Sequence, residues 1–173
     1  MPTTMNKPDS AKKADSTLQL VSFSLEKEIF AIDVMKVCGV ERMMTITSIP
    51  GMPEFIEGVI NLRNIRNLKT NSIVPVVDLR KRFRLPRREP DERTRIVLVE
   101  LESELVVGIM VDSVEEVFQV EQNMLDAVPR FGRGPVDNRY VKGVAQRGDR
   151  LIILMDIEKV FSEEETRDMM RLT

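Results

Sequence analysis

Strict alternation of hydrophobic and polar residues begins near Leu18, and Val21-Ser-Phe23-Ser-Leu25 is its clearest example. Such alternation is typical of a strand with one buried face. Short runs rich in β-branched residues follow at 28–33, 58–63, 73–78, 94–101, 105–112 and 150–156. Many short strands separated by turns predict a mainly β fold, either a small barrel or a sandwich.

Turns and short helices are predicted between these strands. Glu102-Ser-Glu104 and Gln146-Arg-Gly-Asp149 are each flanked by strand-like sequence, as hairpin turns are. Residues 79–83 and 157–165 each follow an aspartate that can cap a helix, so both are predicted to be helical.

The chain carries an internal repeat. In both 73–83 and 151–161, five apolar residues precede Asp, an aliphatic residue, any residue, Lys, any residue and Phe. Upstream, the spacing of one set of four apolar residues recurs in a second set: Ile32, Val34, Val37 and Val40 in the first copy, and Ile109, Val111, Val114 and Val117 in the second. Two β subdomains built on one plan are therefore predicted.

The repeat also locates an insertion. Gly143 precedes Leu151 by 8 residues, whereas Gly58 precedes Ile73 by 15, a difference of 7. The excess falls in the polar stretch 64–71. A plain surface loop is the ordinary interpretation, because hairpin tips tolerate extension, and a finger that contacts a partner is the alternative.

Composition excludes several kinds of active site. The 173 residues carry a net charge of −2 and include no histidine, which excludes a histidine-dependent triad, the usual histidine-containing zinc sites and phosphotransfer to histidine. The lone Cys38 lies in an apolar stretch and is expected to be a buried structural thiol. No Gly-rich phosphate loop, metal cluster or nucleophile–base pair is present in the sequence. We therefore expect that the protein is not an enzyme and that it binds neither a cofactor nor a metal ion.

The termini and the hydropathy bear on location. Residues 1–16 lack periodicity and are rich in Lys, Ser, Thr, Asp and Pro, so they are expected to form a disordered leader. No apolar run approaches the roughly 20 residues that a membrane helix needs, and the start lacks the apolar core of a signal peptide. The protein is expected to be cytoplasmic, without direct insertion into a membrane.

Residues 80–88, RKRFRLPRR, are strongly basic. They support a distant alternative, a small nucleic-acid-binding β-barrel in which Phe83 stacks on a base. Acidic residues follow at once, however, and Phe83 matches Phe161 in the repeat, which marks it as a core residue. A solvated connector between the subdomains is the preferred interpretation.

The V-x-x-V segments Val37/Val40 and Val114/Val117 occupy equivalent places in the two copies. If the copies pack face to face, these segments flank a shared groove of the kind that accepts an amphipathic helix. For any single one of these valines, the interior remains the preferred position.

Six segments together resemble the CheW family, in order and over about residues 18–162. They are AIDVMKVCGVERM, IEGVINLR, IVPVVDLRKRF, VVGIMVDSVEEVF, YVKGVA and GDRLIILMDIEKVF. The resemblance implies two intertwined five-stranded SH3-like β-barrels with short helices, formed by residues 17–162, and it leaves 163–173 as a helical or flexible tail.

The resemblance also implies a function. The chain is expected to be a non-enzymatic adaptor of chemotaxis signal transduction that tethers the cytoplasmic tip of a chemoreceptor to the regulatory domain of the CheA histidine kinase, in a two-component system. An adaptor of the same family in a non-flagellar chemosensory pathway is the alternative.

Site residues follow from the resemblance one at a time. Arg63, in the N-L-R motif, is implied to contact the receptor, and a guanidinium suits receptor tips that carry carboxylates. Phe131 is implied to contact the kinase domain. The remaining receptor-binding positions are Val37, Gly39, Gly58, Val114 and Val117.

Two departures from the family pattern lie at this implied site. Gly39 stands where the family often has glutamate, and Asn64 with the 7-residue extension replaces the glycine and short turn that usually follow N-L-R. Both changes suggest a variant adaptor matched to an atypical receptor or to a non-motility system.

Overall fold

The computed structural model describes residues 16–62, 72–126 and 138–173. Ten strands dominate them: β1 (Thr17–Leu25), β2 (Glu28–Asp33), β3 (Val37–Arg42), β4 (Ile56–Leu62), β5 (Ser72–Asp78), β6 (Arg95–Glu100), β7 (Val106–Val111), β8 (Ser113–Glu121), β9 (Val141–Arg147) and β10 (Arg150–Met155). The helical elements are short: η2 (Val34–Lys36), α2 (Leu79–Arg82), η3 (Gln122–Met124), η4 (Asn138–Tyr140), η5 (Ile157–Lys159) and α3 (Glu163–Met170).

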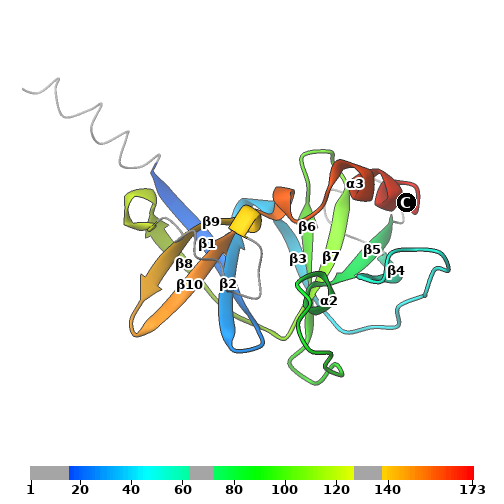
Figure 1. Ribbon diagram of the computed structural model, residues 1–173, viewed down its shortest axis with the longest axis horizontal. Coiled ribbons are helices and arrows are strands. Elements are labelled where there is room, and N and C mark those ends of the chain that lie inside the picture. Colours follow the sequence, from blue (N-terminus) through cyan, green and yellow to red (C-terminus); the bar gives the residue numbers. More distant parts are fainter. Residues whose placement is uncertain (1–15, 63–71, 127–137) are drawn as a thin grey trace, which may run out of the picture.

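The strands form two five-stranded sheets that lie side by side (Figure 1). Sheet A has the order β8-β1-β2-β10-β9, and sheet B has the order β3-β6-β7-β5-β4. Each sheet contains one parallel pair, β2 with β10 in sheet A and β7 with β5 in sheet B. The two orders match position by position, which confirms the prediction of two subdomains built on one plan.

Both sheets curl into barrels that are closed by a single bridge. Thr47, beyond the edge strand β3, pairs with Val59 on the opposite edge strand β4. Asp126, beyond the edge strand β8, pairs with Val144 on β9 in the same way. We call the closed sheets barrel A and barrel B.

The barrels are intertwined, because each takes strands from both halves of the chain. Barrel A combines β1 and β2 with β8, β9 and β10, while barrel B takes the strands between them. The prediction of a mainly β fold with two intertwined five-stranded barrels is therefore confirmed.

Three hydrophobic clusters fill the described part of the molecule. One lies in barrel B around Ile96 and Leu98, and one lies in barrel A around Leu20 and Phe118. The third and largest joins the barrels and includes Phe23 of β1 and residues of both sheets. We call it the central cluster. Burial of this shared apolar surface holds the barrels together.

The predicted helix 79–83 is confirmed as α2, which Asp78 caps by accepting a hydrogen bond from the Arg80 N–H at 2.9 Å. The predicted helix 157–165 is wrong as one element. Asp156 caps only the 3₁₀ turn η5, and Ser162 then starts α3 with a capping box to Glu165. A second cap, three residues after the end of η5, divides the segment.

Candidate partner-binding surface

The V-x-x-V segments lie on the equivalent strands β3 and β8. Val37 and Val114 are half-buried and pack against the central cluster, so both segments lie at the junction of the barrels. Val40 and Val117 are 44% and 54% exposed. The interior position preferred for each valine is wrong for these two, because residues on the outer face of a barrel strand have no sheet to cover them.

A methionine next to these valines escaped the sequence analysis. Met35 is 85% exposed and lies in η2, directly before β3. Asp33 caps this turn by accepting a hydrogen bond from the Met35 N–H at 2.9 Å. A capped turn that presents methionine to solvent is a recognisable signal for an adaptable apolar contact.

Gly39 lies at a bulge of β3, where the pairing with β6 shifts between Val37 and Gly39. A Cβ at this position would lie 3.3 Å from Leu98 Cδ1, and Leu98 is buried. The position therefore admits a side chain only if Leu98 shifts by a few tenths of an ångström. Gly39 differs from the glutamate of the family pattern in local packing as well as in charge.

Gly58 is required by the closure of barrel B. Its φ is +149°, and a Cβ there would lie 2.1 Å from the carbonyl oxygen of Thr47. Thr47 and Val59 exchange two backbone hydrogen bonds of 2.9 Å at this point. The family resemblance implied that another group approaches Gly58 closely, and in this structure that group is the backbone of Thr47 in the same chain.

Arg63, Phe131 and the extension 64–71 lie outside the described residues. Their roles remain predictions. β4 ends at Leu62, directly before Arg63.

A charged clamp joins the barrels at α2. The guanidinium of Arg80, in barrel B, donates to both carboxylate oxygens of Asp112 at 2.7 and 2.6 Å, and to Glu26 in barrel A at 3.2 Å. It also donates to the carbonyl of Pro86 at 2.7 Å. The hydrogen bonds to Asp112 raise the pKa of Arg80 above its ordinary value, so the group stays charged although the residue is only 4% exposed.

Arg82 ties the C-terminal helix to the same junction. It binds Glu165 of α3 through two hydrogen bonds of 2.8 and 2.9 Å and donates to the carbonyl of Val160. Its guanidinium lies 4.8 Å from the centre of the Phe55 ring. The interpretation of residues 80–88 as a solvated connector is therefore wrong for Arg80 and Arg82, since carboxylates distant in the sequence draw both side chains inward.

Phe83 is 4% exposed and Phe161 is 6% exposed, which confirms both as core residues. Phe83 therefore cannot present its ring to a base, and the stacking proposed for a nucleic-acid-binding barrel has no support. Cys38 is half-buried rather than buried, and burial raises the pKa of its thiol above the ordinary value. A thiol with a raised pKa is a poor nucleophile.

Comparison with known proteins decides the family. A family model described as the CheW-like domain matches residues 19–165. The chain belongs to the CheW family. Its relatives include the chemotaxis protein CheW of Klebsiella aerogenes, which is 34% identical over 85% of this chain and 83% of that protein. CheW of Treponema pallidum is 30% identical over 91% of this chain and 90% of that protein.

A solved CheW structure agrees with the fold. The scaffolding protein TtCheW of Thermoanaerobacter tengcongensis superposes with a TM-score of 0.74 at 34% identity, covering 86% of this chain and 90% of that one. CheW proteins are scaffold and adaptor proteins of chemotaxis and are not enzymes, so the sequence predictions of family and adaptor function are confirmed. In the part of the chain that the structure describes, no helix is long and apolar enough to cross a membrane.

Proposed function

We propose that this CheW protein tethers the cytoplasmic tip of a chemoreceptor to the regulatory domain of the CheA kinase, and that it acts in the cytoplasm, where both partners present these parts. The exposed apolar residues of η2, β3 and β8 are the observation that supports the receptor-binding role. Met35, Val40 and Val117 are exposed, and Val37 and Val114, on the same strands as the two exposed valines, are half-buried against the central cluster. Such a surface suits a helical partner with an apolar face.

The rigid clamp at α2 suits an adaptor. Arg80 fixes the barrels to each other through carboxylates from both sides of the junction. A partner bound at the V-x-x-V segments therefore meets a preformed surface, which lowers the entropic cost of binding. Catalysis belongs to the kinase, and the adaptor contributes geometry and binding energy.

The relatives favour chemotaxis over a non-flagellar pathway, since the CheW proteins of Klebsiella aerogenes and Treponema pallidum are both described as chemotaxis proteins. The two departures at Gly39 and 64–71 still motivate a hypothesis of altered receptor preference. Equal binding of a standard receptor tip before and after deletion of the extension and Gly39→Glu would count against it.

Titration against a chemoreceptor cytoplasmic fragment and a CheA regulatory domain tests the proposal. Val117→Ala removes exposed apolar area, and at about 25 cal/mol per Å² the loss of two methyl groups weakens receptor binding roughly five- to tenfold. Arg63→Ala is expected to weaken the receptor arm by more than about tenfold. Leu151→Ala is the matched control for the receptor arm, because Leu151 is 61% exposed in barrel A but lies outside the proposed surface.

Selective loss of receptor binding in Val117→Ala and Arg63→Ala, with kinase binding retained, would support both the function and the site. Binding to the kinase alone would move the receptor site elsewhere. A folded protein that binds neither cognate partner would overturn the proposed function.

A further inference from the structure

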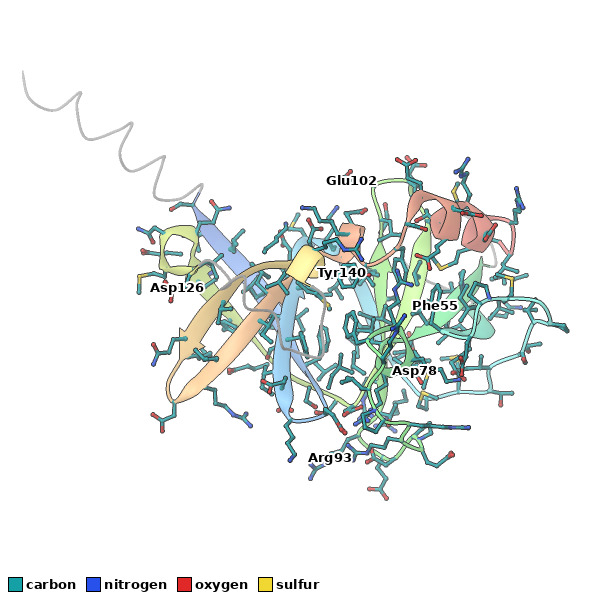
Figure 2. The ribbon with its side chains drawn as sticks, viewed as in Figure 1. Phe55, Asp78, Arg93, Glu102, Asp126 and Tyr140 are labelled. Carbon is teal, nitrogen blue, oxygen red and sulfur yellow. The ribbon has the colours of Figure 1, made fainter. Side chains whose placement is uncertain are left out.

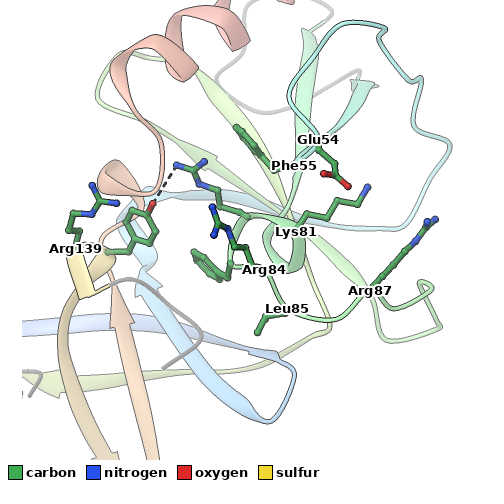
Figure 3. A pocket seen from close by; sticks show the side chains of 10 residues that line it. Glu54, Phe55, Lys81, Arg84, Leu85, Arg87 and Arg139 are labelled. Carbon is green, nitrogen blue, oxygen red and sulfur yellow. Dashed lines mark hydrogen bonds between the residues drawn. The ribbon is translucent and has the colours of Figure 1, made fainter. Parts of the chain in front are cut away.

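A second surface lies at the barrel junction, lined by none of the residues predicted to bind the receptor. It is a groove of about 750 Å³ between α2, the segment before β4 and η4. Figure 3 shows Arg139 on one side of it and Lys81 and Arg87 on the other, with Arg84 between them. We call it the junction groove.

The lining of the junction groove is strongly cationic. Its charged residues are Glu54, Lys81, Arg82, Arg84, Arg87 and Arg139. Lys81 Nζ lies 2.6 Å from Glu57 Oε1, an ion pair without hydrogen-bond geometry, and Arg82 is neutralised by Glu165. These two cations are therefore engaged within the protein.

Arg84 and Arg87 are available to a ligand. Arg87 and Glu89 approach only to 3.7 Å, with both side chains about four-fifths exposed, so this pair is weak. Arg84 has no ion-pair partner among the residues that the structure describes.

The backbone at Arg84 gives an independent reason to look for a ligand. Arg84 ends α2 in the left-handed conformation with φ +59°, and its N–H donates to the Lys81 carbonyl at 3.2 Å. Glycine is the ordinary residue at such a helix end, because a Cβ makes this conformation unfavourable. The chain instead carries an exposed arginine that no contact within the described protein compensates. Strain of this kind is found at binding sites.

The floor of the junction groove is preorganised. Phe83 and Tyr140 pack with ring centres 5.9 Å apart, and Phe55 stacks on Phe161 at 6.3 Å. Figure 2 labels Phe55 in barrel B and Tyr140 just before β9 of barrel A, toward the middle of the molecule. A ligand there meets packed aromatic walls, with the exposed cations Arg84 and Arg87 beside them.

The parts of the chain outside the described structure do not match the charge of the junction groove. By sequence, residues 1–15 carry three Lys and two Asp, residues 63–71 carry three basic residues, and residues 127–137 carry two Arg and one Asp. All three are net positive. The complementary occupant is therefore a separate, negatively charged molecule.

We propose that the junction groove binds an acidic polypeptide segment of a partner protein, with carboxylates paired to Arg84 and Arg87. A polypeptide fits better than a nucleic acid because of the spacing of its charges. Glu54 lines the same groove, and a peptide can place carboxylates at Arg84 and Arg87 and a neutral residue at Glu54, whereas a nucleic acid carries a phosphate at every nucleotide. This proposal is independent of the receptor and kinase sites proposed above.

The protein carries its own reporter of the junction groove. Tyr140 is the only tyrosine of the chain, and the sequence contains no tryptophan. Intrinsic fluorescence of the full-length protein therefore reports from the groove wall alone. The probe is a ten-residue synthetic peptide containing four glutamates and no aromatic residue, and its comparison is the same peptide with four glutamines.

The decisive variants are Arg84→Gly and the double variant Arg84→Gly/Arg87→Gln. Arg84→Gly relieves the strain of the left-handed backbone, so it raises the unfolding temperature. It also removes one cation from the groove, which weakens binding of the glutamate peptide about three- to tenfold. Glu104→Gly is the matched control, because Glu104 also has a positive φ of +68° but lies in the turn between β6 and β7. It is expected to raise the unfolding temperature without changing the fluorescence titration.

The proposal requires that the glutamate peptide bind and the glutamine peptide not bind, that added salt weaken binding, and that the double variant lose it. Equal binding of both peptides, no response of Tyr140, or unchanged affinity in the double variant would overturn it. Tighter, arginine-dependent binding of a single-stranded oligonucleotide would also overturn it, in favour of a nucleic-acid site. Receptor and kinase binding of Arg84→Gly are expected to equal those of the parent, which separates this test from that of the proposed function.

Discussion

Gly58→Ala tests whether closure of barrel B is what demands a glycine. A Cβ at this position would lie 2.1 Å from Thr47 O and 2.7 Å from Thr47 C. An unstrained carbon-to-oxygen contact needs about 3.3 Å, so the Thr47 carbonyl must retreat by about 1 Å. That shift breaks the two hydrogen bonds of 2.9 Å between Thr47 and Val59.

The cost follows from these contacts. Two backbone hydrogen bonds contribute about 1 kcal/mol each, and a residue forced to a positive φ costs about 1–3 kcal/mol. The free energy of unfolding should fall by roughly 3–5 kcal/mol, which corresponds to roughly 6–20 °C in the melting temperature of a chain of this size. Chemical denaturation followed by far-UV circular dichroism measures the free energy directly.

Two glycines provide a graded control. Gly148 has a positive φ of +63° but nothing within 4 Å of a Cβ, so Gly148→Ala carries only backbone strain of about 1 kcal/mol. At Gly143, the counterpart of Gly58 in barrel A, a Cβ would lie 3.2 Å from Asp126 O, a contact that small shifts relieve. If Gly58→Ala costs no more than Gly148→Ala, the closure argument is refuted. If it is fully stable yet binds the receptor more weakly, Gly58 is a contact residue after all.

Three further predictions concern the junction and the helices. Arg80→Ala removes the two-point partner of the largely buried Asp112, which keeps only the Glu26 N–H at 2.9 Å and a long ion pair with Arg88 at 3.5 Å, so it should cost about 1–3 kcal/mol in chemical denaturation. The exposed Arg87→Ala should change stability by less than about 0.5 kcal/mol, and similar values for both variants would refute the clamp. Burial raises the pKa of Asp78 above its ordinary 3.8, so the stabilisation that this carboxyl gives in its protonated form is full below pH 3.8 and is lost as the pH rises through the folded-state pKa. Asp78→Asn keeps the capping oxygen but carries no charge, so it should be more stable than the parent at neutral pH. Denaturation curves should show this difference in stability shrink as the pH falls toward 3.8. A difference that stays constant with pH would contradict the prediction. Met169→Ala should lower the free energy of unfolding by about 2–5 kcal/mol, because Met169 is fully buried. Met170 is 44% exposed, so Met170→Ala should lower it by less than about 1 kcal/mol in the same denaturation experiment. Equal losses would show that α3 does not pack as described.

Part of the candidate surface was accessible from the sequence. The repeat paired Val37/Val40 with Val114/Val117, and the structure places these pairs on the equivalent strands β3 and β8. The V-x-x-V spacing did not show that β3 and β8 are strands, because a bulge at Gly39 and another between Val114 and Val117 break the alternation of buried and exposed residues. The junction groove depends on tertiary contacts that no local pattern contains.

The sequence by itself determined the strands other than β3, β8 and β9, the turns at 102–104 and 146–149, the cap of α2 and the plan of two similar subdomains. These features arise from side-chain periodicity and caps within a few residues. The tertiary structure alone decided which strands share a barrel, since β2 pairs with β10 across more than a hundred residues. It also decided that Arg80 is buried, because the carboxylate that binds it lies 32 residues away in the chain. Local patterns specify how a segment buries one face, whereas the partner that covers this face is chosen by contacts between distant residues.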